Sequence, residues 1–434
     1  MSDKSKEFYE FVQKKIEKLH EEGSLENKFG SFWKMVSDLK YNQYDLRLFY
    51  NDTSREFVEK YKERLVKMRE DFIENMDYYV ENCINIMRKT NKFKVHYAKT
   101  NEEAQQLFME ELGDSKVIYK SKSVEAKDIG IIDVLKENNI QIKETDLGDV
   151  LVQLFDYKLP SFQIGPGVHF TIDEIVAKIK EVHGVELEPK ASAIVEYYRK
   201  TYRKELLNNV KISLTSANVI SAEDGTIILG ENEGNISLLT RATEKHIVVC
   251  GISKIVPTLL DAVLVAKLQS RINNISFAYI SLISAPSNTS DIRGTSVQGM
   301  YGAKEVVVIL VDDWRTKAFK ENLIFKDFLK CIGCRSCIYI CTASRAFGNI
   351  YASKYGLGAT AIIRDYIHNG IEAAVKDGLF LCTGCENCFH WCPISINLGE
   401  IMQSIKKEAT LLGLCPPPLR KYQQKILKNK NPFK

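Results

Sequence analysis

The pattern of apolar and polar residues changes twice along this 434-residue chain. Up to about residue 90 the chain is densely charged, and apolar residues recur at three- and four-residue steps, which predicts a helix with one apolar face. The residues of this face are Phe57, Tyr61, Leu65, Met68 and Phe72. We interpret the face as a packing surface, with a cofactor-binding role for its aromatic rings as the alternative. Residues 1–90 are predicted to be a charged helical N-terminal extension.

Residues 91–319 alternate short apolar runs with helical stretches. Continuous apolar runs such as EVVVILV indicate strands buried on both faces, and therefore a mostly parallel sheet covered by helices. The expected strands are 93–97, 116–119, 140–143, 212–215, 226–229, 246–250, 277–282 and 306–311. The expected helices are 102–112, 124–138, 171–182 and 257–268. The pattern is typical of a Rossmann-like α/β domain.

Eight of the eleven cysteines fall in two copies of the spacing C-x2-C-x2-C-x3-C, in CIGCRSCIYIC and CTGCENCFHWCP. In this motif three cysteines of one run bind a [4Fe–4S] cluster, and the fourth binds the cluster of the other run. We therefore expect two clusters with exchanged ligands. The first takes Cys331, Cys334, Cys337 and Cys392, and the second takes Cys382, Cys385, Cys388 and Cys341. Structural zinc is the alternative, but it leaves half of these cysteines unused.

The two runs are not identical in their surroundings. Pro393 follows the second run, as the motif prefers, whereas Thr342 stands at the corresponding position of the first. The insert of 40 residues between Cys341 and Cys382 favours an α-helical ferredoxin domain over residues 320–412. Three prolines, at 416–418, are expected to stop regular structure, which leaves residues 413–434 as a basic tail. The tail either binds an acidic partner or is a solvated end.

Composition excludes several classes of protein. The net charge of +4 falls to near zero once two clusters of about −2 each are counted, which argues against nucleic-acid binding. No apolar run approaches the roughly 20 residues of a membrane span, and the charged N-terminus is unlike a signal peptide. Unpaired cysteines at cluster spacing need a reducing compartment, so we expect a cytoplasmic location. No glycine-rich dinucleotide or phosphate loop is present.

The segment GENEGN, residues 230–235, follows an apolar run and places acids and amides at the end of a strand. Ligands of open α/β sheets bind at such ends. Glu231 or Glu233 is a candidate base or nucleophile, and Asn232 and Asn235 are candidate anion-binding amides. Lys120 and Lys122 of the segment KSKS are candidate charge partners that also end a strand. The alternative is structural, with the acids capping the next helix and Gly234 permitting the turn.

Taken together, these segments resemble the iron–sulfur B-subunit family of the L-lactate utilisation complex, in which a LUD domain is fused to two ferredoxin motifs. The resemblance covers residues 90–410, in KSKS, ETDLGD, DGTIILGENEGN, HIVVCGISKIVPTL, both cysteine runs and FGNIYASKYGLGAT. It implies a LUD fold similar to the sugar-isomerase and CoA-transferase superfamily. It also implies partners, namely a CCG-domain redox subunit and a second LUD protein, which together oxidise lactate to pyruvate. No paired CCG cysteines occur in this chain, so such a subunit would be separate.

The expected function is therefore electron transfer through two [4Fe–4S] clusters in a complex that oxidises L-lactate or a related small 2-hydroxyacid. We expect no transmembrane segment, and membrane association only at the periphery through partners. Whether the LUD domain is itself catalytic stays open. Two alternatives also stay open: an electron hub of a heterodisulfide-reductase-like complex, and a LUD-domain transferase or isomerase with accessory clusters.

Overall fold

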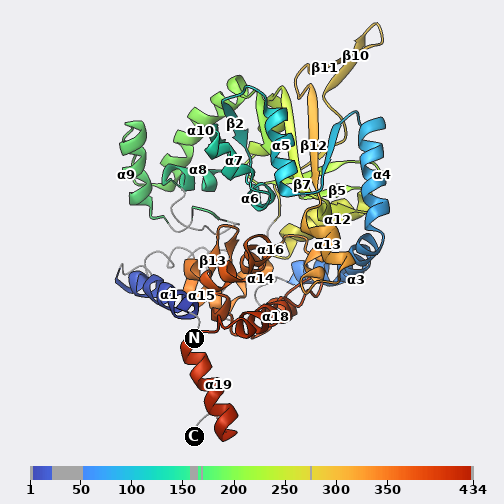
Figure 1. Cartoon of the computed structure of the whole chain (residues 1–434). Coiled ribbons are helices and arrows are strands. Elements are labelled where there is room, and N and C mark those ends of the chain that lie inside the picture. The colour runs from blue at the N-terminus through green and yellow to red at the C-terminus, as the bar shows by residue number, and fades with distance from the viewer. Residues whose placement is uncertain (1–2, 22–51, 157–164, 168–169, 274–275, 432–434) are drawn as a thin grey trace. The chain divides into compact units, whose positions relative to one another are not determined.

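The computed structural model describes residues 3–21, 52–156, 165–167, 170–273 and 276–431 (Figure 1). The chain divides into two compact units. The sheet unit comprises residues 37–158 and 170–334, and the helical unit comprises 1–36, 159–169 and 335–434. Residues 22–51 of the predicted N-terminal extension lie outside the described residues.

Six parallel strands form the centre of the sheet unit, in the order β1-β12-β7-β4-β2-β3. Their bounds are β1 (Lys94–Ala98), β2 (Val117–Lys120), β3 (Gln141–Glu144), β4 (Ile212–Thr215), β7 (Lys245–Gly251) and β12 (Glu305–Val311). Each was predicted from its apolar run to within one residue. The fold is the expected Rossmann-like α/β sheet, because all six strands run in one direction and the four inner strands are buried on both faces.

Helices cover both faces of this sheet. Successive side chains of a strand point to opposite faces, and neighbouring residues of β2 belong to two separate cores. Ile118 packs with residues of α5 (Asn101–Leu112), α6 (Val124–Asp128) and α7 (Ile131–Glu137), whereas Tyr119 packs with α10 (Ala191–Asn209) and α11 (Asn235–Ala242). The predicted single helix 124–138 was wrong, because Gly130 adopts a left-handed φ of 84° between α6 and α7. Further helices of this region are α8 (Leu147–Leu154), α9 (Ile172–His183) and α13 (Trp314–Lys320).

A second, smaller sheet of four strands has the order β8-β5-β6-β9. The strands are β5 (Val219–Ser221), β6 (Ile227–Glu231), β8 (Ile255–Val256) and β9 (Tyr279–Ile283). The strand that leads into GENEGN is β6, and it pairs antiparallel with β5 and β9. It is therefore not a strand of the parallel sheet, although a buried strand of either sheet has the same kind of apolar sequence. An exposed hairpin, β10 (Asn288–Ile292) and β11 (Thr295–Gln298), follows β9.

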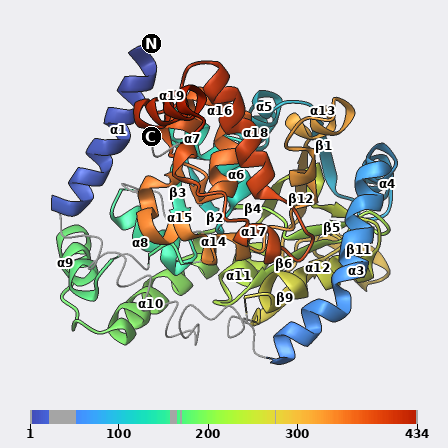
Figure 2. The same ribbon diagram turned by 90° about the horizontal axis from the view of Figure 1, so that it is seen from below.

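The N-terminal helices of the sheet unit are α3 (Asp52–Glu74) and α4 (Met76–Lys89). Helix α3 packs against α12 (Leu259–Arg271), and α4 packs against β1 (Figures 1 and 2). Leu65, Met68 and Phe72 are buried, so the apolar face of α3 is a packing surface, as interpreted. Between them Arg69 is also buried, although it is charged.

The helical unit contains α1 (Asp3–Glu21), α14 (Ser336–Tyr339), α15 (Thr342–Phe347), α16 (Ala359–Lys376), α17 (Asn387–His390), α18 (Leu398–Leu411) and α19 (Pro417–Asn429). Helix α16 packs against α18 and α1 (Figure 2). A short hairpin, β13 (Ala352–Ser353) and β14 (Gly356–Leu357), precedes α16 in the insert between the two cysteine runs. The expectation that the prolines end regular structure was also wrong. Helix α19 begins at Pro417, because proline in a first helical turn has no N–H that needs a partner. Among the described residues, no helix is both long and apolar enough to cross a membrane.

Buried charges meet at the carboxyl end of β7. The guanidinium of Arg315 lies 3.3 Å from Glu125 and 3.6 Å from Asp128, and all three side chains are almost fully buried. The backbone N–H of Gly251 donates to Glu125 Oε2 at 3.0 Å. Gly251 also packs directly against the guanidinium, so that a β-carbon at this position would lie 2.1 Å from Arg315 Nη2. The absence of a side chain at residue 251 is what lets the charges pair.

We expect Gly251→Ala to lower the free energy of unfolding by about 1–3 kcal/mol, because the new methyl group displaces the guanidinium from its two carboxylates. Denaturant unfolding of the variant measures this change. Ser253→Ala is the matched comparison, because it removes only the hydroxyl that Arg315 Nε contacts at 3.2 Å. A Gly251→Ala protein as stable as the parent would show that the ion cluster rearranges freely.

Candidate iron–sulfur and ligand sites

The two cysteine loops have the same backbone conformation at equivalent positions. The glycine before the second cysteine has a φ of 75° at Gly333 and 69° at Gly384. The residue after the second cysteine has a φ of 65° at Arg335 and 58° at Glu386, although neither is glycine. Each loop then enters a helix of four residues, α14 or α17, which contact one another in the helical unit. The duplicated spacing in the sequence therefore corresponds to a duplicated loop geometry, as cluster-binding runs require.

Within the helical unit, Cys341 of the first run lies close to the second run. Thr342 Oγ1, next to Cys341, is 3.6 Å from Cys385 Sγ and 3.3 Å from Thr383 Oγ1. Burial, together with the neighbouring Cys341 and Cys382, raises the pKa of Cys388 to about 12. The backbone N–H of Ser344 donates to Cys341 Sγ at 3.4 Å. Cys341 thus lies near cysteines of the second run, as the exchanged ligand set for the second cluster predicts, although no group of three or more side chains among the described residues is already arranged to hold a metal ion.

Cys331 and Cys334 belong to the sheet unit, whereas Cys337 and Cys392 belong to the helical unit. The backbone N–H of Gly333 donates to Cys331 Sγ at 3.4 Å. N–H groups directed at sulfur are common at iron–sulfur sites, where they help to set the reduction potential. The assignment of these four cysteines to one cluster stays a prediction from the motif spacing.

Three segments that the sequence singled out meet beside the parallel sheet. The backbone N–H of Leu147, in the ETDLGD segment, donates to Glu233 Oε2 at 3.0 Å. Asn235 Nδ2 donates to Thr145 Oγ1 at 3.2 Å, and Lys122 Nζ lies 3.3 Å from Asp146. The segments KSKS, ETDLGD and GENEGN therefore form one site, even though β6 belongs to the second sheet.

The predicted residues do not all take the same part in this site. Glu231 is buried and accepts hydrogen bonds from the backbone N–H groups of Ile236 and Ser237, so its contacts are those of a cap on α11. The turn that follows it depends on Gly234, whose φ is 83°. Asn232 Oδ1 accepts from the backbone N–H of Ala278 at 3.2 Å and holds the GENEGN loop to the segment before β9.

Of the two lysines, Lys120 is fully buried and bonds to Glu144 at 2.6 Å, which makes it part of the core. Lys122 is partly exposed, and its charge lowers the pKa of Glu233. Lys122 is therefore the lysine that faces the site.

Glu233 and Asn235 line a pocket of about 930 Å³ in the sheet unit. Its wall includes Arg199 and Arg203, one turn apart on α10, and Arg241 on α11. Sequence reasoning missed these arginines, because on an amphipathic helix they are indistinguishable from solvated charges. The only available signal was the four-residue spacing of the first two, which places them on one side of a helix. The pocket combines one carboxylate with several cations, which suits an anionic ligand.

The carboxyl group of Glu233 is set apart by its pKa. Partial burial within the pocket and the neighbouring Asp146 raise this pKa to about 7, against the opposing effects of the Leu147 N–H and Lys122. A carboxyl group with a pKa near the working pH can both take up and release a proton, which is the property that a general base needs. Among the predicted site residues, Glu233 is therefore the strongest candidate for acid–base chemistry.

Comparison with known proteins identifies two domain families in the chain. The LUD domain family matches residues 80–311, and the 4Fe-4S dicluster domain family matches residues 327–396. The chain is 27% identical to "Uncharacterized electron transport protein YkgF" of Escherichia coli K12 over 79% of this chain and 70% of that protein. It is also 27% identical to "Lactate utilization protein B" of Geobacillus thermodenitrificans, over 92% of this chain and 88% of that protein. A crystal structure of a DUF162 family protein from Deinococcus radiodurans covers 54% of this chain and 97% of its own length at 15% identity, with a TM-score of 0.29, too low to bear on the fold. The chain belongs to the LUD domain family and carries a dicluster domain for two [4Fe–4S] clusters.

Proposed function

We propose that this protein is the electron-transfer subunit of a complex that oxidises L-lactate or a related small 2-hydroxyacid. The observation that carries the proposal is the presence, in one chain, of a cluster-binding domain and of a cation-lined pocket whose carboxyl group titrates near pH 7. Relatives that match most of the chain are named for lactate utilisation. The protein therefore has the parts needed to bind a small acid and to carry its electrons away.

In this proposal the pocket binds the carboxylate of the hydroxyacid through the arginines of its wall, Arg199, Arg203 and Arg241. Glu233 accepts the proton of the hydroxyl group as that group becomes a carbonyl, and the hydrogen on C2 leaves as the second proton to solvent. Conversion of a 2-hydroxyacid to a 2-oxoacid releases two electrons and two protons, and two clusters that each accept one electron match this number. We propose that a separate CCG-domain redox subunit and a second LUD protein complete the reaction and take up the electrons.

We expect the anaerobically purified complex to contain about eight iron atoms per chain of this protein. Addition of L-lactate is expected to bleach the visible absorption of the clusters, because substrate electrons reduce them. Stopped-flow absorption with L-lactate, D-lactate and glycolate measures the effect, and acetate, which has no hydroxyl group to oxidise, is the control.

Two outcomes would contradict this function in different ways. Clusters that dithionite reduces but no hydroxyacid reduces would favour the electron hub of a heterodisulfide-reductase-like complex. Acyl or isomer products formed without any change in cluster absorption would favour a transferase or isomerase, an alternative that the size of the pocket keeps open.

A further inference from the structure

The loop that carries Cys331 and Cys334 is held by side chains from distant parts of the sheet unit. Gln269 Nε2 on α12 donates to the carbonyl of Ile332 at 2.5 Å, and Asn273 Nδ2, just beyond α12, donates to the carbonyl of Cys334 at 2.6 Å. All of these atoms belong to one compact unit. The carbonyls on either side of Gly333 are therefore fixed by the LUD domain.

The same loop is clamped at its start by Arg69 of α3. This guanidinium donates to the carbonyls of Leu329 at 2.7 Å and Lys330 at 3.3 Å, which directly precede Cys331. It also donates to the carbonyls of Ser253 at 2.7 Å and Ile255 at 2.8 Å, on either side of Lys254. Arg69 thus joins the cysteine loop to the segment that carries Lys254.

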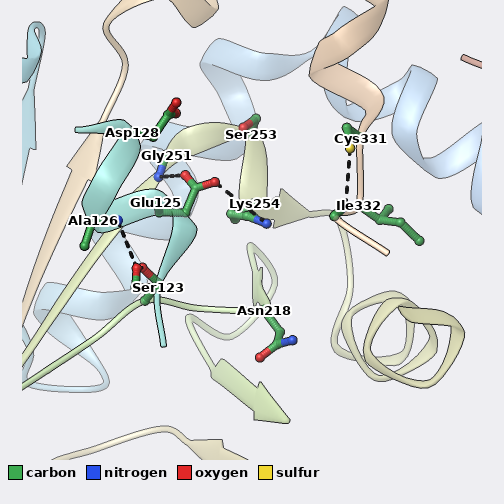
Figure 3. Close-up of polar contacts among 12 residues, drawn as sticks. Ser123, Glu125, Ala126, Asp128, Asn218, Gly251, Ser253, Lys254, Cys331 and Ile332 are labelled. Atoms are coloured by element: carbon green, nitrogen blue, oxygen red, sulfur yellow. Dashed lines mark hydrogen bonds and ion pairs between the residues drawn. The ribbon is translucent and has the colours of Figure 1, made fainter. Parts of the chain in front are cut away.

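Lys254 brings a positive charge to this loop. Its ammonium group would lie 3.4 Å from a β-carbon built on Gly333, and it is 3.9 Å from Glu125 Oε1. Figure 3 shows the Lys254 side chain directed from the end of Glu125 towards Ile332, beside Cys331. Only 14% of the side chain is exposed, so solvent screens its charge poorly. The ammonium group therefore lies beside the backbone of the loop at Gly333.

The second cysteine loop differs at the equivalent place. A β-carbon built on Gly384 would meet the amide of Gln403, at 2.6 Å, and not an ammonium group. The carbonyl of Cys382 is held by Lys406 of α18, within the helical unit. The first loop is therefore mounted on the LUD domain, and the second on the ferredoxin helices.

A hydrogen-bonded chain also joins the first loop to the GENEGN segment. The N–H of Gly230 donates to Asn218 Oδ1 at 2.9 Å, Asn218 Nδ2 donates to Gln269 Oε1 at 2.7 Å, and Gln269 bonds to Ile332 as described. Two amide side chains thus separate the strand that begins the ligand segment from the backbone of the cysteine loop.

We propose that the sheet unit positions and tunes the first cluster: Arg69, Gln269 and Asn273 fix the loop that binds it, and the Lys254 ammonium group stabilises its reduced form. Reduction adds one negative charge to the cluster, and a nearby, poorly screened cation makes that charge more favourable. Lys254 is a positioning and electrostatic residue in this account, not a ligand. The proposal rests on the electron-transfer role proposed above, but it does not depend on which substrate supplies the electrons.

The test is a dithionite redox titration of Lys254→Met, followed by EPR. We expect the midpoint potential of the first cluster to shift to a more negative value, so that a smaller fraction is reduced at a given potential, and the second cluster to be unaffected. Lys254→Arg is expected to restore the parent potential. Lys267→Met is the matched control, because Lys267 is an exposed lysine of α12. Unchanged potentials in Lys254→Met with full iron content would overturn the electrostatic role.

The positioning role is tested separately with Asn273→Ala and Gln269→Leu. We expect each variant to lose iron from the first cluster faster than the parent in the presence of a chelator, with the second cluster retained. If Lys254→Met fails to fold, Lys254→Gln replaces it in the redox titration of the first test. Equal rates of iron loss from both clusters would show that these amides have only a general structural role. Because dithionite is the electron donor, a failure of hydroxyacids to reduce the protein leaves both tests intact.

Discussion

Cys341→Ala is expected to remove the second cluster and to leave the first. Iron should fall from about eight to about four atoms per chain, and the EPR signal of the reduced second cluster should disappear. The reason is that Cys341, although it belongs to the first run in the sequence, lies beside the second run. Its neighbour Thr342 contacts both Thr383 and Cys385.

The matched control is Cys415→Ala, which removes a buried cysteine of the same unit that lies outside both runs. We expect this variant to keep all of its iron. Loss of the cluster held by Cys331 and Cys334 in Cys341→Ala, with the other cluster intact, would show that each run binds its own cluster without exchange. The same variant shows which EPR signal belongs to which cluster. The redox titration of Lys254→Met requires this assignment.

Glu233→Gln is expected to lower the rate of substrate-driven cluster reduction by about 100-fold or more, because glutamine cannot accept a proton. The measurement is stopped-flow absorption of the reconstituted complex with L-lactate. Reduction by dithionite should be unchanged, since it bypasses the pocket. Glu188→Gln is the control, because it makes the same replacement at an exposed glutamate that pairs with Lys190 outside the pocket.

The pH dependence gives a second test of Glu233. A base works when it is ionised, so the rate in the parent protein should rise as pH increases through about 7, the pKa of this carboxyl group, and Glu233→Gln should lose that rise.

The stability of the parent protein should change with pH in the opposite direction to the rate. A carboxyl group whose pKa is raised by folding destabilises the fold once it is ionised, so its cost appears as pH rises from about 4.5 through about 7. At pH 8 Glu233→Gln should therefore be at least as stable as the parent. A slow variant that is also less stable would instead indicate a structural role for GENEGN.

Local patterns predicted much of the architecture. The six strands of the parallel sheet could be placed because each is a continuous apolar run, and the two clusters because eight cysteines repeat one spacing. What failed depends on pairing over long distances. No local signal separates β6, in the second sheet, from a strand of the parallel sheet, and both are equally apolar. The break at Gly130 was missed because a single glycine is tolerated in many helices.

The candidate sites show the same division. The motif alone predicts that Cys341 binds the cluster of the other run, and the position of Glu233 after a strand predicts a ligand role; the structure places Thr342 beside Cys385 and Glu233 in the pocket, and both roles stay predictions. The different roles of Glu231 and Glu233, two residues apart, could not be separated from the sequence. They are set by which carboxylate reaches the N–H groups of α11 and which reaches the pocket. The arginines of α10 enter the site only through tertiary packing, more than 25 residues before GENEGN in the chain.

The clamp made by Arg69 has a consequence for how the protein matures. The bond from this guanidinium to the carbonyl of Lys330 closes a span of 261 residues. Contacts between residues so distant in sequence form late in folding, because they must overcome the entropy cost of closing the long intervening chain. A newly synthesised 331–341 segment therefore has its cysteines in order but lacks its support until the N-terminal helices have docked. Iron delivered before that moment meets a mobile peptide, whereas iron delivered afterwards meets a formed site. Insertion of the first cluster therefore depends on completion of the sheet unit, because Arg69 supports the cysteine loop only after the N-terminal helices have packed.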